Sequence, residues 1–72
     1  MALTDTVSRN LKSQRLKRKL SQDALATRTG LSVSMISMLE RGQRGATLET
    51  LEKMAKALGV RPLSLLEDGG RK

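Results

Sequence analysis

Apolar residues recur along the chain at the three- and four-residue spacing that is typical of short helices. Leu3, Val7 and Leu11 are each four residues apart, and Leu16 and Leu20 continue the apolar face. A second stripe follows later in the chain: Leu48, Leu51, Met54, Ala55 and Leu58. Such spacing aligns side chains on one face of an α-helix. Because no segment shows the two-residue alternation of a half-buried strand, the pattern predicts an all-α protein.

Capping residues and glycines divide the chain into five helical segments. The helices are expected at residues 4–18, 22–29, 33–41, 48–58 and 62–67. The first four have residues at their start whose side-chain oxygen can cap a helix N-terminus: Thr4, Ser21, Ser32 and Thr47. Glycines that suit a left-handed helix end follow the second, third and fourth helices: Gly30, Gly42 and Gly59. Pro62 suits the first turn of the last helix.

The same pattern predicts the core and the extent of the domain. Apart from the two stripes, the residues expected to face inward are Leu25, Ala26, Ile36, Leu39 and Leu65. Leu63 and Leu66 could belong either to the core or to a dimer contact. A chain of 72 residues forms one domain at most. We expect this domain to span residues 1–68 and to end in a flexible tail at residues 69–72.

The charged residues are distributed unevenly. The chain has 14 Lys and Arg against 7 Asp and Glu, a formal net charge of +7. Residues 1–46 hold nine basic and three acidic residues, hence +6, whereas residues 47–72 hold five and four, hence +1. Such asymmetry in a small domain favours a basic face that binds a polyanion. The alternative is that the charge serves solubility alone.

Several residue types are absent, and each absence excludes a class of function. Without Cys or His the chain has neither the usual zinc ligands nor a hydrolytic relay. Without aromatic residues it has no platform on which single-stranded bases could stack. Glu49 and Glu52 lie beside Lys53 and Lys56, which indicates a solvated face and not a catalytic pair. We therefore expect that the protein is not an enzyme and that it binds no cofactor, metal or small-molecule ligand. No apolar run could span a membrane.

The most informative stretch is a pair of helices joined by a very short turn. Residues 22–29 and 33–41 are separated by only Gly30-Leu31-Ser32. Such a turn makes two helices cross steeply, as in a helix-turn-helix. The second helix then has a core side and an outer side that is mostly short and polar: Ser34, Ser37, Met38 and Arg41. A helix with small outward side chains can lie deep in a major groove.

Residues 20–60 carry a specific combination of motifs and read LSQDALATRTGLSVSMISMLERGQRGATLETLEKMAKALGV. This segment resembles the Cro/repressor-type helix-turn-helix family, which is also called lambda-repressor-like or XRE. The informative pieces are Ser-Gln opening a helix, the Gly turn, Ile-Ser-x-Leu-Glu-Arg-Gly, Thr-Leu-x-x-Leu and Ala-Leu-Gly-Val. The resemblance implies a compact five-helix domain that binds double-stranded DNA as a homodimer.

The resemblance also implies roles for individual residues. The base-contacting residues would be Ser32, Val33, Ser34, Ser37 and Met38. The phosphate-contacting residues would be Gln22, Arg41, Gln43 and Arg44, with main-chain N–H groups of the loop contributing. An Arg in the first helix pairs with the Glu of the Leu-Glu-Arg-Gly motif in the family, which here gives Arg15 and Glu40. This pair would account for an arginine four residues after Leu11, on an apolar face.

One position departs from the better-known repressors, which often have a long amide where this chain has Val33. A valine can only touch a thymine methyl, and serine is a promiscuous donor and acceptor. Direct readout is therefore expected to be modest, with more left to DNA shape. A phosphate contact and a solvated helix end are both open for the basic run Lys17-Arg18-Lys19.

Together these features predict a sequence-specific transcriptional regulator, either a Cro-like repressor or a controller protein. It would bind a pseudo-palindromic operator with half-sites roughly 34 Å apart. The two-fold contact is expected around residues 60–66. The expected setting is the bacterial or phage-infected cytoplasm, at the nucleoid. The alternative is a protein-interaction module of the antitoxin or coactivator type. The lack of a toxin-binding extension within residues 1–72 counts against an antitoxin.

Overall fold

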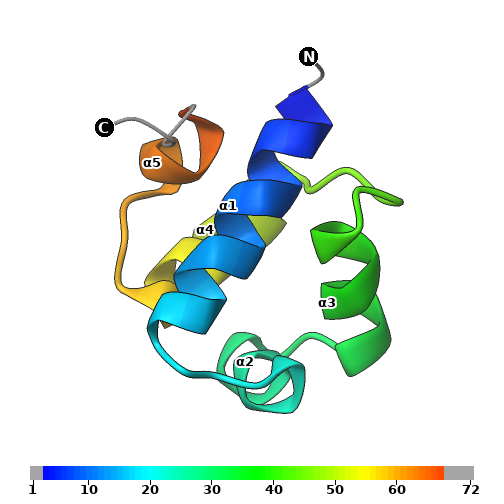
Figure 1. Ribbon diagram of the computed structural model, residues 1–72, viewed down its shortest axis with the longest axis vertical. Helices are drawn as coiled ribbons and strands as arrows, with labels where there is room; N and C mark the ends of the chain where they lie inside the picture. Colours follow the sequence, from blue (N-terminus) through cyan, green and yellow to red (C-terminus); the bar gives the residue numbers. More distant parts are fainter. Residues whose placement is uncertain (1–2, 68–72) are drawn as a thin grey trace.

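The computed structural model describes residues 3–67, which form five α-helices. These are α1 (Leu3–Lys17), α2 (Gln22–Thr29), α3 (Val33–Glu40), α4 (Leu48–Leu58) and α5 (Pro62–Leu66). In Figure 1, α1 runs between α5 and α3, α4 crosses behind it, and α2 lies below. The all-α prediction is thus confirmed for the described residues. The expected domain end at residue 68 and the tail at residues 69–72 lie outside them.

Local sequence sets most helix boundaries as predicted. The hydroxyl oxygens of Ser21, Ser32 and Thr47 accept hydrogen bonds from main-chain N–H groups three residues ahead, at 3.0, 3.0 and 3.1 Å. These bonds satisfy donors that a helix N-terminus leaves unpaired. Gly30 and Gly59 end α2 and α4 with φ of 77° and 72°. Side chains with a Cβ rarely adopt this conformation, so both glycines are needed where they stand.

The ends of α1 differ from the prediction. Thr4 lies inside α1, which includes Leu3, and so Thr4 is not its N-cap. At the other end, α1 stops at Lys17, one residue earlier than expected. Lys19 then adopts a left-handed φ of 55°, a conformation that the sequence does not signal because a non-glycine residue rarely takes it.

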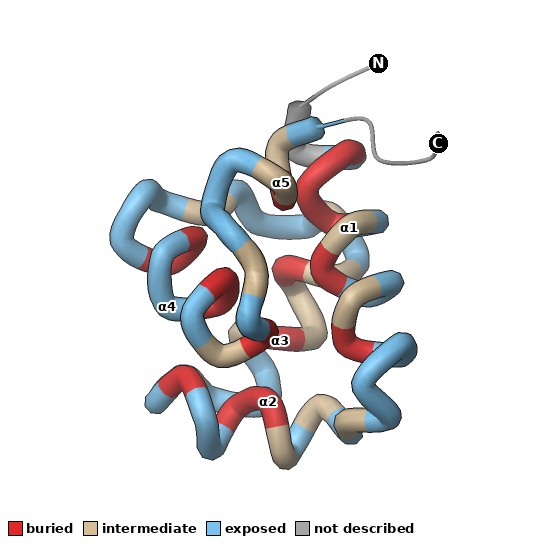
Figure 2. Tube along the Cα trace, turned by 90° about the vertical axis from the view of Figure 1, so that its left-hand side faces the viewer, coloured by how far each residue is buried: buried red, intermediate tan, exposed pale blue. Residues whose placement is uncertain are grey.

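All five helices contribute to one core. The largest side chains with essentially no exposure are Leu11, Leu25, Ile36, Leu39, Met54, Leu58 and Leu65. Figure 2 shows buried residues on every helix. Full burial of one such side chain stabilises the fold by about 1.5–3 kcal/mol. Within residues 3–67, the helices are too short and too polar to cross a membrane.

Two leucines predicted to be buried are exposed. Leu16 is 54% exposed, because the inward face of α1 passes from Leu11 to Arg15 and the next residue points about 100° away from it. Leu48 is 78% exposed. It is the first residue of α4, and the buried face of that helix begins only at Thr50 and Leu51. The prediction thus placed Leu16 on the wrong face of α1, and it extended the buried face of α4 one turn too far toward its start.

Candidate nucleic-acid interface

The turn between α2 and α3 is fixed by a buried threonine. The hydroxyl of Thr29 donates to the carbonyl oxygen of Leu25 at 2.9 Å and accepts from the N–H of Leu31 at 3.2 Å. These two bonds close the turn immediately after α2. Figure 1 shows the result: α2 is seen nearly end-on, whereas α3 runs up the page. The two helices cross steeply, as the short turn predicted.

α3 has one buried side and one exposed side. Ile36 and Leu39 are 0% and 2% exposed and pack into the core. On the other side Val33 and Ser34 are exposed, and Ser37 is half-buried. The side that remains open to solvent thus starts with small side chains, which let a helix approach base edges closely.

The two other residues expected to contact bases, Met38 and Ser32, are less free than Val33 and Ser34. Met38 is half-buried, so part of its side chain remains accessible beside the serines. The Ser32 oxygen accepts the Met35 N–H at 3.0 Å as the N-cap of α3. A serine hydroxyl has one donor and two acceptor sites, and the cap uses one acceptor. Ser32 could therefore still donate to a base while holding the helix start.

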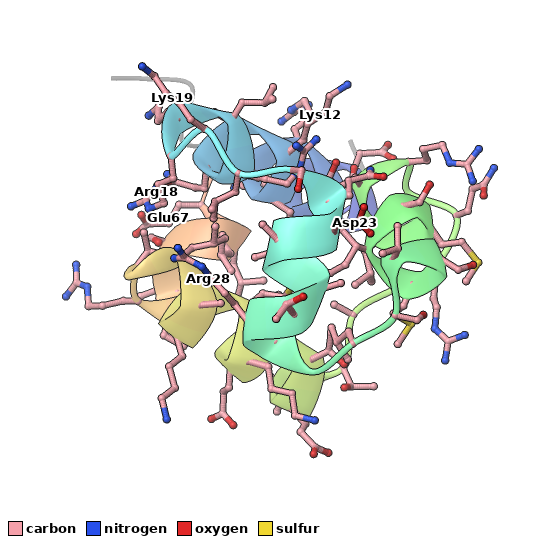
Figure 3. The ribbon with its side chains drawn as sticks, turned by 90° about the horizontal axis from the view of Figure 1, so that it is seen from below. Lys12, Arg18, Lys19, Asp23, Arg28 and Glu67 are labelled. Carbon is pink, nitrogen blue, oxygen red and sulfur yellow. The ribbon has the colours of Figure 1, made fainter. Side chains whose placement is uncertain are left out.

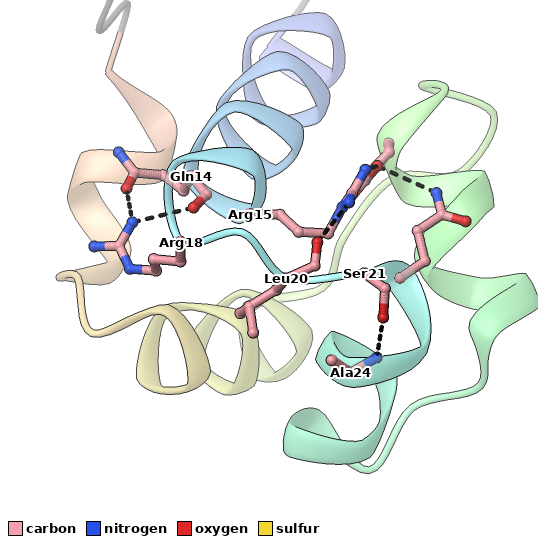
Figure 4. A network of polar contacts seen from close by, with 8 residues as sticks. Gln14, Arg15, Arg18, Leu20, Ser21 and Ala24 are labelled. Atoms are coloured by element: carbon pink, nitrogen blue, oxygen red, sulfur yellow. Dashed lines mark hydrogen bonds and ion pairs between the residues drawn. The ribbon is translucent and has the colours of Figure 1, made fainter.

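A buried ion pair joins α3 to α1. Nε of Arg15 donates to Oε2 of Glu40 at 2.6 Å, and a second guanidinium nitrogen donates to Oε1 at 3.0 Å. Another donates to the carbonyl oxygen of Leu20 at 2.8 Å. The two side chains are 10% and 3% exposed. Figure 4 shows how this network connects α1, the turn after it and the end of α3.

The electrostatics of the pair follow from this geometry. Hydrogen bonding by the Glu40 carboxylate raises the pKa of Arg15, and burial opposes this with a smaller effect. The arginine therefore remains charged at neutral pH and well above it. Because a bidentate guanidinium–carboxylate contact has a fixed planar geometry, it sets the position of α3 relative to α1.

Gln22 contacts the same carboxylate. Its Nε2 donates to Oε1 of Glu40 at 3.2 Å, which links the start of α2 to the end of α3. An amide nitrogen has two hydrogens, so one donor of Gln22 remains for another acceptor. The side chain is half-buried. Gln22 thus buttresses α3 in this structure, and a phosphate contact would use its second N–H.

The loop that follows α3 uses its first main-chain N–H groups to close the helix. The N–H of Arg41 donates to the carbonyl oxygen of Ser37 at 3.1 Å, and that of Gln43 donates to the carbonyl oxygen of Met38 at 3.0 Å. A phosphate contact by Arg41 or Gln43 must therefore come from the side chain, which is exposed in both. The Arg44 side chain is exposed as well.

The basic run at the end of α1 lies elsewhere. Figure 3 places Arg18 and Lys19 on the left and α3 on the right, and Figure 1 shows the same separation of the α1 end from α3. Arg18 donates to the main-chain and side-chain carbonyl oxygens of Gln14, a residue of α1. Of the two roles left open for this run, the solvated helix end fits its position.

Comparisons with known proteins support the arrangement. A family model described as Helix-turn-helix matches residues 11–65. Control protein C.BamHI of Bacillus amyloliquefaciens is 45% identical over 51 residues, 71% of this chain and 63% of that protein. Control protein C.SmaI of Serratia marcescens is 38% identical over 72 residues, 100% of this chain and 86% of that protein. This chain thus spans less than two thirds of C.BamHI but most of C.SmaI.

A solved structure agrees with the fold. The restriction-modification controller protein C.AhdI from Aeromonas hydrophila superposes with a TM-score of 0.83 and 35% sequence identity, over 86% of this chain and 94% of that chain. The resemblance inferred from residues 20–60 is confirmed. Because the family model matches most of the sequence, this chain belongs to the XRE-type helix-turn-helix family of DNA-binding regulators, which are not enzymes.

Proposed function

We propose that the chain is a sequence-specific regulator of the Cro-like repressor or controller type that places α3 in the major groove of duplex DNA. The observation that carries the proposal is the exposed, small-residue side of α3, held outward by a buried ion pair at its end. The sequence relatives named as control proteins support the controller assignment.

The exposed side of α3 can contact both the polar groups and the methyl groups of base edges. Ser34 and Ser37 each offer a hydroxyl that can donate to or accept from a base. Val33 and Met38 offer apolar surface that fits thymine methyl groups. Because no long amide or arginine occupies these four positions, few bidentate base contacts are available. Part of the specificity is then expected from DNA shape.

Phosphate contacts would supply most of the affinity. Arg41 and Arg44 follow α3 directly and are both exposed. Gln43 is exposed in the same loop, and Gln22 lies at the start of α2. Contacts from these side chains on both sides of α3 would fix its depth and register in the groove.

Dimerisation would use α5. Leu63 is 61% exposed on this helix, and Val60 and Leu66 are half-buried nearby. Asn10 holds the end of α5 to α1, since its amide donates to the carbonyl oxygens of Leu65 at 2.8 Å and Glu67 at 2.7 Å. A helix fixed in this way can set the spacing of two α3 helices, roughly 34 Å for adjacent major grooves.

Selection of bound duplexes from a randomised pool tests the proposal. The expected result is a pseudo-palindrome whose half-site centres are about 10 base pairs apart. Failure to enrich any sequence, together with no retention of duplex at moderate salt, would contradict it. That result would favour the protein-interaction alternative, in which the same fold docks another protein.

A further inference from the structure

A basic groove lies between α2 and α4, away from the proposed DNA-reading helix. It has a volume of about 480 Å³ and is lined by Arg28, Thr29, Lys53, Lys56 and Ala57. Three of these five residues are cations, contributed by two helices that are far apart in the sequence. Figure 3 shows Arg28 on the side of α2 that faces α4, with α3 on the other side of α2. We call this feature the α2–α4 groove.

The cations in the α2–α4 groove are weakly compensated. Among the described residues, no carboxylate lines it. Nζ of Lys53 lies 3.7 Å from Oε2 of Glu49, but these side chains are 47% and 78% exposed. An exposed pair of this kind contributes little and competes poorly with another anion.

Helix dipoles do not explain the whole cluster. Arg28 and Lys56 lie in the last turns of α2 and α4, where a positive charge is favourable. That effect accounts for a cation near each helix end. It does not require the cations to line one groove, and it does not apply to Lys53 in the middle of α4. Their convergence creates a local positive potential that attracts an anionic partner.

The lining also identifies the kind of anion. Ala57 and the aliphatic stems of the lysines and arginine make the surface of the α2–α4 groove more apolar than polar. A polypeptide segment with alternating carboxylates and small apolar side chains matches both features. A second DNA duplex would bring its phosphates but much less apolar surface.

We propose that the α2–α4 groove docks an acidic segment of a second protein. The inference builds on the proposed function in one respect: with α3 in a major groove, α2 would stand between the duplex and this groove. The regulator could then hold DNA and an acidic protein at the same time, on two separate basic surfaces.

A labelled peptide tests this inference directly. The probe is a fluorescein-labelled decapeptide of alternating Glu and Ala, titrated with the full chain and followed by fluorescence anisotropy. The test variant is R28Q/K53Q/K56Q. The control variant K12Q/R18Q/K19Q removes the same number and types of charge from exposed positions on or just after α1. All six substituted side chains are exposed, so both variants are expected to fold, and circular dichroism checks this.

The expected result is that the test variant binds the peptide about tenfold more weakly, while the control variant changes affinity less than twofold. Equal weakening in both variants would show a net-charge effect and overturn the proposal. So would absence of peptide binding by the unaltered protein.

A parallel titration with duplex DNA separates this inference from the proposed function. Both variants are expected to lose similar amounts of duplex affinity through their lower charge. A markedly larger loss in the groove variant would place the α2–α4 groove in the DNA interface and overturn its assignment to a protein partner. Because the peptide titration uses the protein without DNA, its outcome stands even if no duplex is bound.

Discussion

At the scale of single residues, the contact between Arg15 and Glu40 sets the position of α3 relative to α1. Both side chains are almost completely removed from solvent and are joined by two hydrogen bonds. The carboxylate raises the pKa of Arg15. The stabilisation is therefore fully present below the pKa of the arginine in the unfolded chain. The contribution of the arginine is lost as the pH rises through its higher pKa in the folded state, far above neutrality.

Replacing Glu40 by alanine is expected to lower the free energy of unfolding by about 3–5 kcal/mol, because it leaves a buried arginine without its partner. The exposed Glu52 on α4 provides the matched control, and Glu52→Ala is expected to change stability by less than about 0.5 kcal/mol. Thermal unfolding followed by circular dichroism measures both. Equal melting temperatures for the two variants would show that the ion pair does not stabilise the fold.

Replacing Ser34 by alanine is expected to change sequence preference more than total affinity. The hydroxyl is exposed on the outer side of α3, and each base contact contributes about 1–3 kcal/mol of discrimination at best. Site selection with the variant measures this. An unchanged consensus would show that this side of α3 does not read bases.

Replacing Arg44 by alanine is expected to weaken binding to all duplexes by a similar factor. If the side chain contacts one phosphate, the slope of log K against log salt falls by about 0.9. Titrations with specific and random duplexes at several salt concentrations measure both quantities. A loss confined to one sequence would instead assign Arg44 to base readout.

Residue-scale features could be predicted from the sequence where they depend on neighbours along the chain. Ser21, Ser32 and Thr47 cap their helices because a cap needs only the next three residues. The network around Glu40 could be predicted only in part. The family resemblance gave the contact with Arg15, but the bond from Arg15 to the Leu20 carbonyl is made to the main chain, which no side-chain pattern encodes.

At the scale of elements, α5 depends on the rest of the fold. Five residues do not form a stable helix alone. Leu65 is fully buried, and the two bonds from Asn10 hold the carbonyl groups at its end. The exposed Leu63 on the same helix is then presented at a fixed orientation relative to α1. This makes α5 suitable as a dimer contact.

Replacing Leu63 by serine is expected to raise the dimer dissociation constant by about tenfold or more, since a leucine buried in an interface contributes about 1.5–3 kcal/mol. Leu16 has a similar exposure, 54% against 61%, but lies on α1. The control Leu16→Ser should leave dimerisation unchanged. Sedimentation equilibrium measures both variants. A larger effect of Leu16→Ser would move the two-fold contact to α1.

The order and approximate bounds of the helices could be predicted because apolar spacing, caps and glycines agree along the chain. The exposure of Leu48 could not be predicted in this way. Periodicity gives the direction of a side chain on its helix, but whether another helix covers that position depends on packing between distant segments. The clamp by Asn10 was missed for the same reason, since its acceptors are 55 and 57 residues away.

At the scale of the whole molecule, the fold distributes basic residues of the described part of the chain over separate surfaces. Arg41 and Arg44 follow α3, whereas Arg28 lines the α2–α4 groove together with cations of α4. The sequence predicted an excess of charge in its first 46 residues but not this division. The groove brings together residues 28 and 53–57, which no local pattern connects.

The most consequential of these proposals is that α3 occupies the major groove of DNA. Methylation interference on the selected operator tests it most directly. Methyl groups on guanine N7 lie in the major groove, whereas those on adenine N3 lie in the minor groove. If α3 lies in the major groove, N7 methylation is expected to interfere with binding within both half-sites. Interference from N3 methylation alone, or from neither modification, would contradict it.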